Sequence, residues 1–185
     1  DLSQDIRATL GCMEALGADW SLEDRTLTVQ GFGGEAQLDG QLPHFDCGES
    51  GSTLRFLIPV ALAVAGGGIF TGRGRLLSRP QEPYANLFAA KGIFYAKEAQ
   101  AITVGGVLTP GTYSLPGDVS SQFVTGLLYA LPLLEGDSRI TLTTPLESRG
   151  YVDMTLEMLR QFGVAVEERE DGFLVPGRQT YQARD

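Results

Sequence analysis

The sequence predicts an α/β fold built from repeated βαβαββ units, and three observations favour it. Segments 5–17, 82–92 and 151–163 carry apolar residues at helical spacing, and each ends in glycine, the usual residue after a helix. Gly92 lies 75 residues after Gly17, and Gly163 lies 71 residues after Gly92. Short alternating segments follow these glycines, as expected of half-buried strands. The spacing indicates a repeated supersecondary unit rather than a short solenoid repeat.

The same patterns place the other elements. The segment 51–65 is almost wholly apolar after Arg55, so we expect a helix buried on nearly all sides. A second apolar helix is expected over 120–134, and Pro59 and Pro132 should bend or shorten these helices. Alternating or apolar runs predict the strands, at 26–30, 68–71, 101–104, 138–142 and 164–166.

Both ends of the sequence fall inside this pattern. The chain begins directly at the helix 5–17, with no strand before it, and 179–183 looks like the opening strand of a further unit. We therefore expect a single domain over 1–185, with two repeats and the start of a third, truncated at both ends.

Charge and composition narrow the function. The net charge of −9 argues against a nucleic-acid binder, which would show a basic face. Lysine occurs only twice, and four arginines, whose planar forks suit carboxylates and phosphates, fall within one short stretch: Arg55, Arg73, Arg75 and Arg79. Such a cluster suits a small anionic ligand; the alternative is a set of solvated surface arginines.

The sequence gives no support for metal binding, for a membrane-spanning segment or for a signal peptide. Two cysteines (Cys12 and Cys47) and one histidine (His44) cannot build a structural zinc site, and we expect no metal and no cofactor. Cys12 lies within a predicted helix, and we expect it to be a small core residue. No apolar run is long enough to span a membrane, and the acidic start is not a signal peptide. We expect a cytoplasmic monomer.

Hydroxyl side chains stand directly before both apolar helices. Ser50-Gly51-Ser52 precedes the first, and Gly117-Asp118-Val119-Ser120-Ser121-Gln122 precedes the second. A helix start offers free N–H groups and the positive end of the dipole, so it can hold an anion. The alternative is an ordinary helix cap, which needs only one hydroxyl. No lysine follows the glycines as in a nucleotide-binding P-loop.

Two further segments repeat this theme. Arg79 precedes Pro80, which holds its backbone extended, so it could clamp a carboxylate or simply be exposed. Ser148 stands before the helix 151–163 as a cap or a ligand. Repeats related by a pseudo-rotation would bring such helix starts to one face.

Taken in order, four motifs resemble those of the 5-enolpyruvylshikimate-3-phosphate synthases. Residues 49–55 are similar to the family's Asn-Ala-Gly-Thr-Ala-x-Arg, and 117–123 to its Gly-x-x-Ser-Ser-Gln-Phe. Residues 78–80 resemble its x-Arg-Pro segment, and 148–151 its Ser-x-x-Tyr segment. The resemblance covers essentially the whole chain and implies the enolpyruvyl transferase fold, with helices packed inward and sheets outward.

The family transfers the enolpyruvyl group of phosphoenolpyruvate to the 5-hydroxyl of shikimate 3-phosphate and releases phosphate. The resemblance implies that shikimate 3-phosphate contacts Ser120, Ser121, Gln122, Ser148 and Tyr151. It implies that Gly51, Arg79 and Gln122 line the phosphoenolpyruvate pocket, with Arg55 in a supporting role at its base.

Some family features differ or are missing. Glu49 stands where asparagine is usual, and we expect it to bond neighbouring backbone or arginine rather than substrate. The family's Lys-Ser-x-Ser-His-Arg segment and its second domain, which supplies the acid and base, are absent. We therefore assign no catalytic residue and expect binding without turnover, with the second domain as the missing partner.

Three alternatives stay open at the level of sequence. A UDP-sugar enolpyruvyl transferase shares the fold, although Ser-Ser-Gln-Phe favours the shikimate branch. An anion-binding module that is not an enzyme would bind phosphate without preference for the shikimate ring. A purely structural domain would bind neither ligand.

Overall fold

The computed structural model describes residues 1–36 and 38–185. Its elements follow one another along the chain as α1 (Gln4–Ala15), β1 (Asp19–Glu23), β2 (Thr26–Gln30), β3 (His44–Asp46), α2 (Gly51–Ala65), β4 (Gly67–Thr71), the 3₁₀ turn η1 (Leu76–Ser78), α3 (Glu82–Ala90), β5 (Phe94–Lys97), β6 (Ile102–Gly105), β7 (Thr112–Leu115), α4 (Ser121–Ala130), the 3₁₀ turn η2 (Leu131–Leu133), β8 (Ser138–Leu142), α5 (Arg149–Gln161), β9 (Glu167–Arg169) and β10 (Gly172–Val175).

Two four-stranded sheets share one topology, which confirms the predicted repeat. In the first, ordered β3-β4-β6-β5, β3 and β4 are parallel, and β6 pairs antiparallel with both β4 and β5. In the second, ordered β7-β8-β10-β9, β7 and β8 are parallel and β10 pairs antiparallel with its two neighbours. Each sheet therefore comes from one βαβαββ unit, and α1, β1 and β2 match the last three elements of such a unit.

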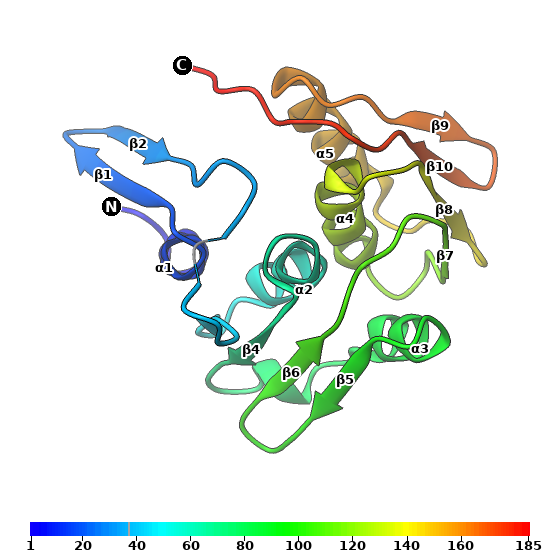
Figure 1. Cartoon of the computed structure of the whole chain (residues 1–185), viewed down its shortest axis with the longest axis horizontal. Coiled ribbons are helices and arrows are strands. Elements are labelled where there is room, and N and C mark those ends of the chain that lie inside the picture. Colours follow the sequence, from blue (N-terminus) through cyan, green and yellow to red (C-terminus); the bar gives the residue numbers. More distant parts are fainter. Residues whose placement is uncertain (37) are drawn as a thin grey trace.

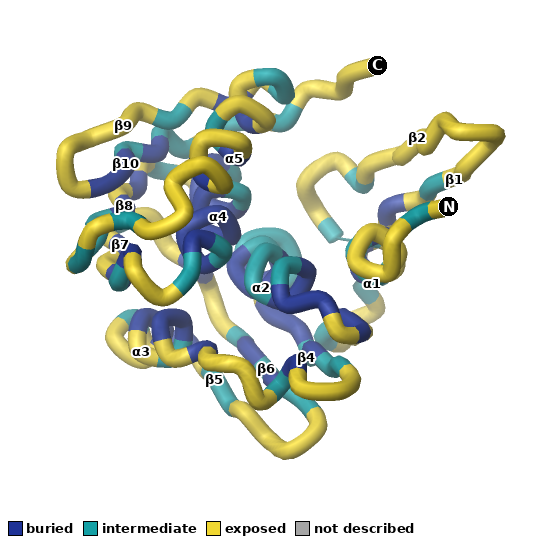
Figure 2. The backbone as a smooth tube through the Cα atoms, turned by 180° about the vertical axis from the view of Figure 1, so that it is seen from behind, coloured by how far each residue is buried: buried dark blue, intermediate teal, exposed yellow. Residues whose placement is uncertain are grey.

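The apolar helices α2 and α4 lie side by side at the centre, with the two sheets on the outside (Figure 1). Their buried residues include Leu54 and Ile58 of α2 and Phe123, Val124 and Leu127 of α4, all fully enclosed. Figure 2 shows the same arrangement as a dark interior around these helices and an exposed outer surface. Burying each such side chain contributes about 1.5–3 kcal/mol, so this pair organises the domain.

The helices α2 and α4 pack closely because a glycine stands at their contact. A Cβ atom added to Gly126 of α4 would lie 2.5 Å from the carbonyl oxygen of Arg55 on α2 and would also meet the Tyr84 hydroxyl. That hydroxyl, on α3, lies 3.0 Å from the Arg55 oxygen and 2.8 Å from the Phe123 oxygen. One tyrosine thus ties α3 to both central helices.

The two prolines have different effects. α2 continues from Gly51 to Ala65 with Pro59 inside it, so that helix is not shortened. The helix predicted over 120–134 ends at Ala130, and Pro132 lies in the 3₁₀ turn η2 that follows. A proline lacks the N–H that the next α-helical bond needs, which explains the shorter α4.

The sequence pattern failed to predict several strands and misplaced one. The prediction over 164–166 is wrong, because the Val164 N–H bonds the Leu159 carbonyl and closes α5, and β9 begins at Glu167. The sequence did not predict five strands: β1, β3, β5, β7 and β10. Most of them are short, and they are stabilised by pairing with strands that lie across a turn or far away in the sequence.

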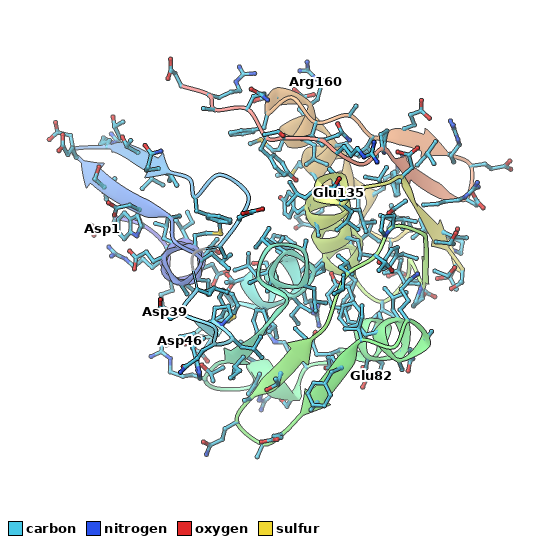
Figure 3. All side chains as sticks on the ribbon, in the orientation of Figure 1. Asp1, Asp39, Asp46, Glu82, Glu135 and Arg160 are labelled. Carbon is cyan, nitrogen blue, oxygen red and sulfur yellow. The ribbon has the colours of Figure 1, made fainter. Side chains whose placement is uncertain are left out.

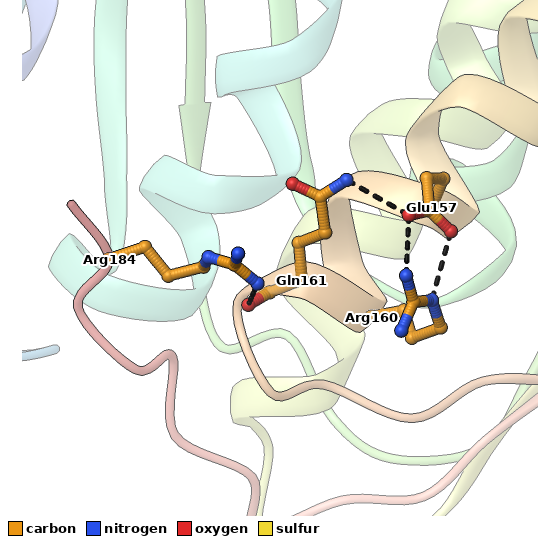
Figure 4. A network of polar contacts seen from close by, with 4 residues as sticks. All are labelled: Glu157, Arg160, Gln161 and Arg184. Atoms are coloured by element: carbon orange, nitrogen blue, oxygen red, sulfur yellow. Dashed lines mark hydrogen bonds and ion pairs between the residues drawn. The ribbon is translucent and has the colours of Figure 1, made fainter.

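The segment 179–183 carries no strand within the described part of the chain. Its backbone bonds helix ends instead, with Gln182 N–H donating to the Phe162 carbonyl at 2.8 Å. Arg184 Nη1 donates to the Gln161 carbonyl at 3.1 Å, beside the exposed pair of Glu157 and Arg160 (Figure 4). The tail is therefore fixed to the C-terminal end of α5.

Candidate functional site

The starts of α2 and α4 are built by serine caps. The Ser50 hydroxyl oxygen accepts the Thr53 N–H at 3.2 Å, and the Ser120 hydroxyl oxygen accepts the Gln122 N–H at 3.2 Å. Both serines have extended backbone, as N-cap residues do. The capping role is thus confirmed for these two residues. Capping uses only the oxygen, so the Ser120 hydroxyl can still donate its hydrogen to an anion.

Three distant segments meet in front of α2. Arg55 Nη1 donates to Gln122 Oε1 at 3.2 Å, and Arg55 Nη2 donates to the Pro80 carbonyl at 2.9 Å. A Cβ atom on Gly51 would lie 2.7 Å from Arg79 Nη1 and 3.9 Å from Gln122 Oε1. The residues predicted for the phosphoenolpyruvate pocket therefore cluster at the start of α2.

The Arg55 guanidinium lies in a crowded positive environment. Burial lowers its pKa, and the nearby Arg79 guanidinium lowers the pKa further. The guanidinium carbon also lies 4.6 Å from the centre of the Phe123 ring, a favourable cation–π arrangement. Among the described residues, neither arginine forms an ion pair with a carboxylate. An anion bound between them would supply the missing counter-charge.

A pocket of about 580 Å³ opens between α2, α4 and α5. All five residues predicted to contact shikimate 3-phosphate line it: Ser120, Ser121, Gln122, Ser148 and Tyr151. The wall is rich in hydroxyl groups, which suit a phosphate and the hydroxyls of a ring. The structure thus brings together, at the starts of α4 and α5, residues that the sequence placed in separate motifs.

The pocket wall also contains Ser52, which the sequence placed at a helix start able to hold an anion. Sequence reasoning missed the other lining residues: Phe56, Val119, Thr125, Tyr129, Glu147, Met154, Thr155 and Met158. Helical spacing was the available signal for several of them. Thr125 and Tyr129 lie one and two turns after Ser121, and Thr155 lies one turn after Tyr151. Thr125 and Thr155 join the two helices through a 3.0 Å hydroxyl–hydroxyl contact.

Ser148 occupies the cap position of α5 but does not cap it. Its side chain makes no capping hydrogen bond, and its φ of 52° lies in the left-handed region. A residue other than glycine is disfavoured there, and such strain is common where side chains serve a ligand. The exposed Tyr151 follows on the first turn of α5. The capping interpretation of Ser148 is therefore not supported, and the ligand interpretation stays a prediction.

The contacts of Glu49 differ from those predicted from the sequence. Its carboxylate lies against Gly74, in the loop after β4. Within residues 1–36 and 38–185, no hydrogen bond or ion pair joins that carboxylate to backbone or arginine. The expected bond is therefore not seen.

The cysteines, the acidic residues and the helix lengths of the described chain point to no further site. Cys12 and Cys47 are buried free thiols in the core, as expected for Cys12. The described residues hold no group of three or more histidine, cysteine or acidic side chains suited to a metal ion. Across the same residues, no helix has both the length and the apolar character to cross a membrane.

Comparison with known proteins agrees with the geometry. The family model described as EPSP synthase (3-phosphoshikimate 1-carboxyvinyltransferase) matches residues 2–185. The chain is 45% identical to the 3-phosphoshikimate 1-carboxyvinyltransferase of Clostridium novyi, over 99% of this chain and 44% of that protein. Against that of Clostridioides difficile the identity is 43%, over 100% of this chain and 45% of the relative. The chain thus spans less than half the length of these relatives.

A solved structure shows the same fold. The EPSP synthase of Acinetobacter baumannii superposes with a TM-score of 0.77 at 24% identity, covering 98% of this chain and 41% of that chain. The enolpyruvyl transferase architecture expected from the motifs is therefore confirmed. Because the family model matches residues 2–185 and the fold is shared, the chain belongs to the EPSP synthase (3-phosphoshikimate 1-carboxyvinyltransferase) family.

Proposed function

We propose that this chain is the shikimate-3-phosphate-binding domain of an enzyme that transfers the enolpyruvyl group of phosphoenolpyruvate to shikimate 3-phosphate. The observation that carries the proposal is the pocket between α2, α4 and α5, where Ser120, Ser121, Gln122, Ser148 and Tyr151 meet. The two α4 serines stand at a helix start, where hydroxyl donors and the helix dipole both favour a phosphate group.

The second substrate is assigned to the neighbouring arginines. We place the carboxylate or phosphate of phosphoenolpyruvate at Gly51, Arg79 and Gln122. Because Gly51 has no side chain, the ligand and the Arg79 guanidinium can approach the backbone there. Arg55 supports the site by fixing the Gln122 amide oxygen, which leaves the amide N–H groups free to donate.

The chain is expected to bind without turnover. Enolpyruvyl transfer needs a proton removed from the ring hydroxyl and a proton delivered to the methylene of phosphoenolpyruvate. We assign these steps to a second domain of the whole enzyme, which would close over this face as a partner. An assay of phosphate release by this chain with both substrates should therefore stay at the background rate.

Calorimetric titration of this chain with shikimate 3-phosphate tests the binding proposal. We expect tighter binding of shikimate 3-phosphate than of shikimate or inorganic phosphate. Ser121→Ala should weaken it about tenfold or more, because a hydrogen bond to a charged group contributes about 1.5–3 kcal/mol. Ser21→Ala, on the exposed strand β1, is the control and should leave the affinity unchanged.

The controls separate the alternatives. Equal affinity for shikimate 3-phosphate and inorganic phosphate would indicate an anion-binding module without ring recognition. No binding of either ligand by a folded chain would contradict the proposed half-site.

A further inference from the structure

The side chains of Arg73 and Arg79 lie against the loop that leads into α2. The Arg73 N–H donates to the Gly48 carbonyl at 2.7 Å, and Arg73 Nη2 lies 3.6 Å from the position of a Cβ atom on Gly48. Gly51 lies three residues after Gly48, and Arg79 Nη1 lies against it in the same way. Arg73, Arg75, Arg79 and Arg55 are named here the arginine row.

The arginine row is not neutralised by ion pairs. Among the described residues, every ion pair formed by an arginine involves one outside the row. Arg73 and Arg75 are exposed, in the loop between β4 and η1. The nearby acidic groups are Glu49, whose carboxylate lies against Gly74 between these two arginines, Asp46, which accepts the Gly48 N–H, and Glu82, which acts on Arg55.

The positive charge of the arginine row contrasts with the net negative charge of the chain. The chain carries a net charge of −9 and would repel a phosphorylated ligand at long range. Figure 3 labels acidic residues in several parts of the chain, among them Asp1, Asp39 and Glu135. The arginine row is therefore a positive approach within a negative surface, and it ends at the start of α2.

We propose that Arg73 and Arg75 are steering residues, which attract the anionic substrates to the site without contacting them, and that Glu49 opposes this attraction. The proposal rests on the proposed function, because it takes the site at Gly51 and Arg79 to bind phosphorylated ligands. It assigns a role to two arginines outside the matched motifs. It also gives Glu49 an effect opposite in sign to theirs.

The size of the effect follows from Coulomb attraction. A single positive charge about 10 Å from a doubly charged phosphate in water changes the affinity about two- to fourfold. At about 0.01 M salt the Debye length is about 30 Å and the attraction is felt; at about 1 M salt it is about 3 Å and the attraction is screened. A direct hydrogen-bonded contact would instead persist at high salt and would depend on the shape of the guanidinium.

The test is calorimetric titration with phosphoenolpyruvate, in the presence of saturating shikimate 3-phosphate, at low and high salt. At low salt, Arg73→Gln and Arg75→Gln should each weaken binding about two- to fourfold, and Glu49→Gln should strengthen it by a similar factor. Arg73→Lys and Arg75→Lys should keep the wild-type affinity, since they keep the charge. At about 1 M salt the glutamine variants should all match the wild type. Arg25→Gln, at the turn of the hairpin β1–β2, removes the same charge as a control (Figure 1).

Each outcome has a distinct meaning. If the wild type fails to bind shikimate 3-phosphate or, with that ligand present, phosphoenolpyruvate, the proposed function fails. If the wild type binds but Arg73→Gln and Arg75→Gln match Arg25→Gln, the steering proposal alone is overturned. It is also overturned if lysine fails to restore the affinity or if the loss persists at high salt, because either result indicates direct contact. An unchanged or weaker affinity in Glu49→Gln contradicts the opposing role of that carboxylate.

Discussion

At the scale of single residues, the first turn of α2 accepts a side chain at Gly51 only if Arg79 moves. A methyl group there would lie 2.7 Å from Arg79 Nη1, and the flexible end of that arginine would have to move. We expect Gly51→Ala to weaken phosphoenolpyruvate binding about tenfold, the loss of one charged hydrogen bond, while the fold is kept. Calorimetry in the presence of saturating shikimate 3-phosphate measures the change.

Gly150 provides the matched control for Gly51. It also lies in the first turn of a helix, α5, but a Cβ atom there would meet nothing within 4 Å. Gly150→Ala should leave phosphoenolpyruvate affinity unchanged. Equal losses in both variants would show that the effect comes from the helix start and not from Arg79.

At the scale of elements, the contact between α2 and α4 depends on Gly126. Gly126→Ala should push the Arg55 carbonyl and the Tyr84 hydroxyl away, and overpacking of this kind costs about 1–3 kcal/mol. Urea unfolding should therefore show a lower midpoint. Gly11→Ala, in open space on α1, is the opposite case and should raise stability by about 1 kcal/mol through helix propensity. A Gly126→Ala midpoint at or above the wild-type value would contradict this account of the helix contact.

The elements also differ in how far sequence could predict them. The helices 51–65 and 82–92 were placed to within a few residues, because the apolar run of the first and the glycine end of the second are local signals. Strands β9 and β3 are three residues each, too short to show a period, and every residue of β9 is charged and exposed. Their pairing partners β10 and β4 decide that they are strands.

At the scale of the whole molecule, buried and half-buried tyrosines predict how stability changes at alkaline pH. Burial, with a smaller contribution from Glu82, raises the pKa of Tyr95 to about 12, and burial raises that of Tyr113 to about 12. Burial also raises the pKa of Tyr84 well above its ordinary value. In the unfolded chain these phenols ionise near pH 10. Above that pH the unfolded state binds fewer protons than the folded state, so stability is full below pH 10 and falls between pH 10 and 12.

Urea midpoints at pH 8, 10 and 11 measure this fall. Tyr95→Phe should make the decline between pH 10 and 11 shallower, because it removes one of the groups that ionise on unfolding. A midpoint that stays constant up to pH 11 would contradict the linkage.

The sequence by itself determined the repeat, the central helices, the family and the residues of each motif. Those features rest on local periodicity and on residues close together along the chain. Tertiary structure alone decided that Arg55 meets Gln122, that Arg79 stands against Gly51, and that Ser148 is held in a left-handed conformation without capping α5. It also added Phe56, Thr125 and Met158 to the pocket. The physical reason is that these contacts join residues that are distant along the chain or depend on how α2, α4 and α5 pack, which no local pattern specifies.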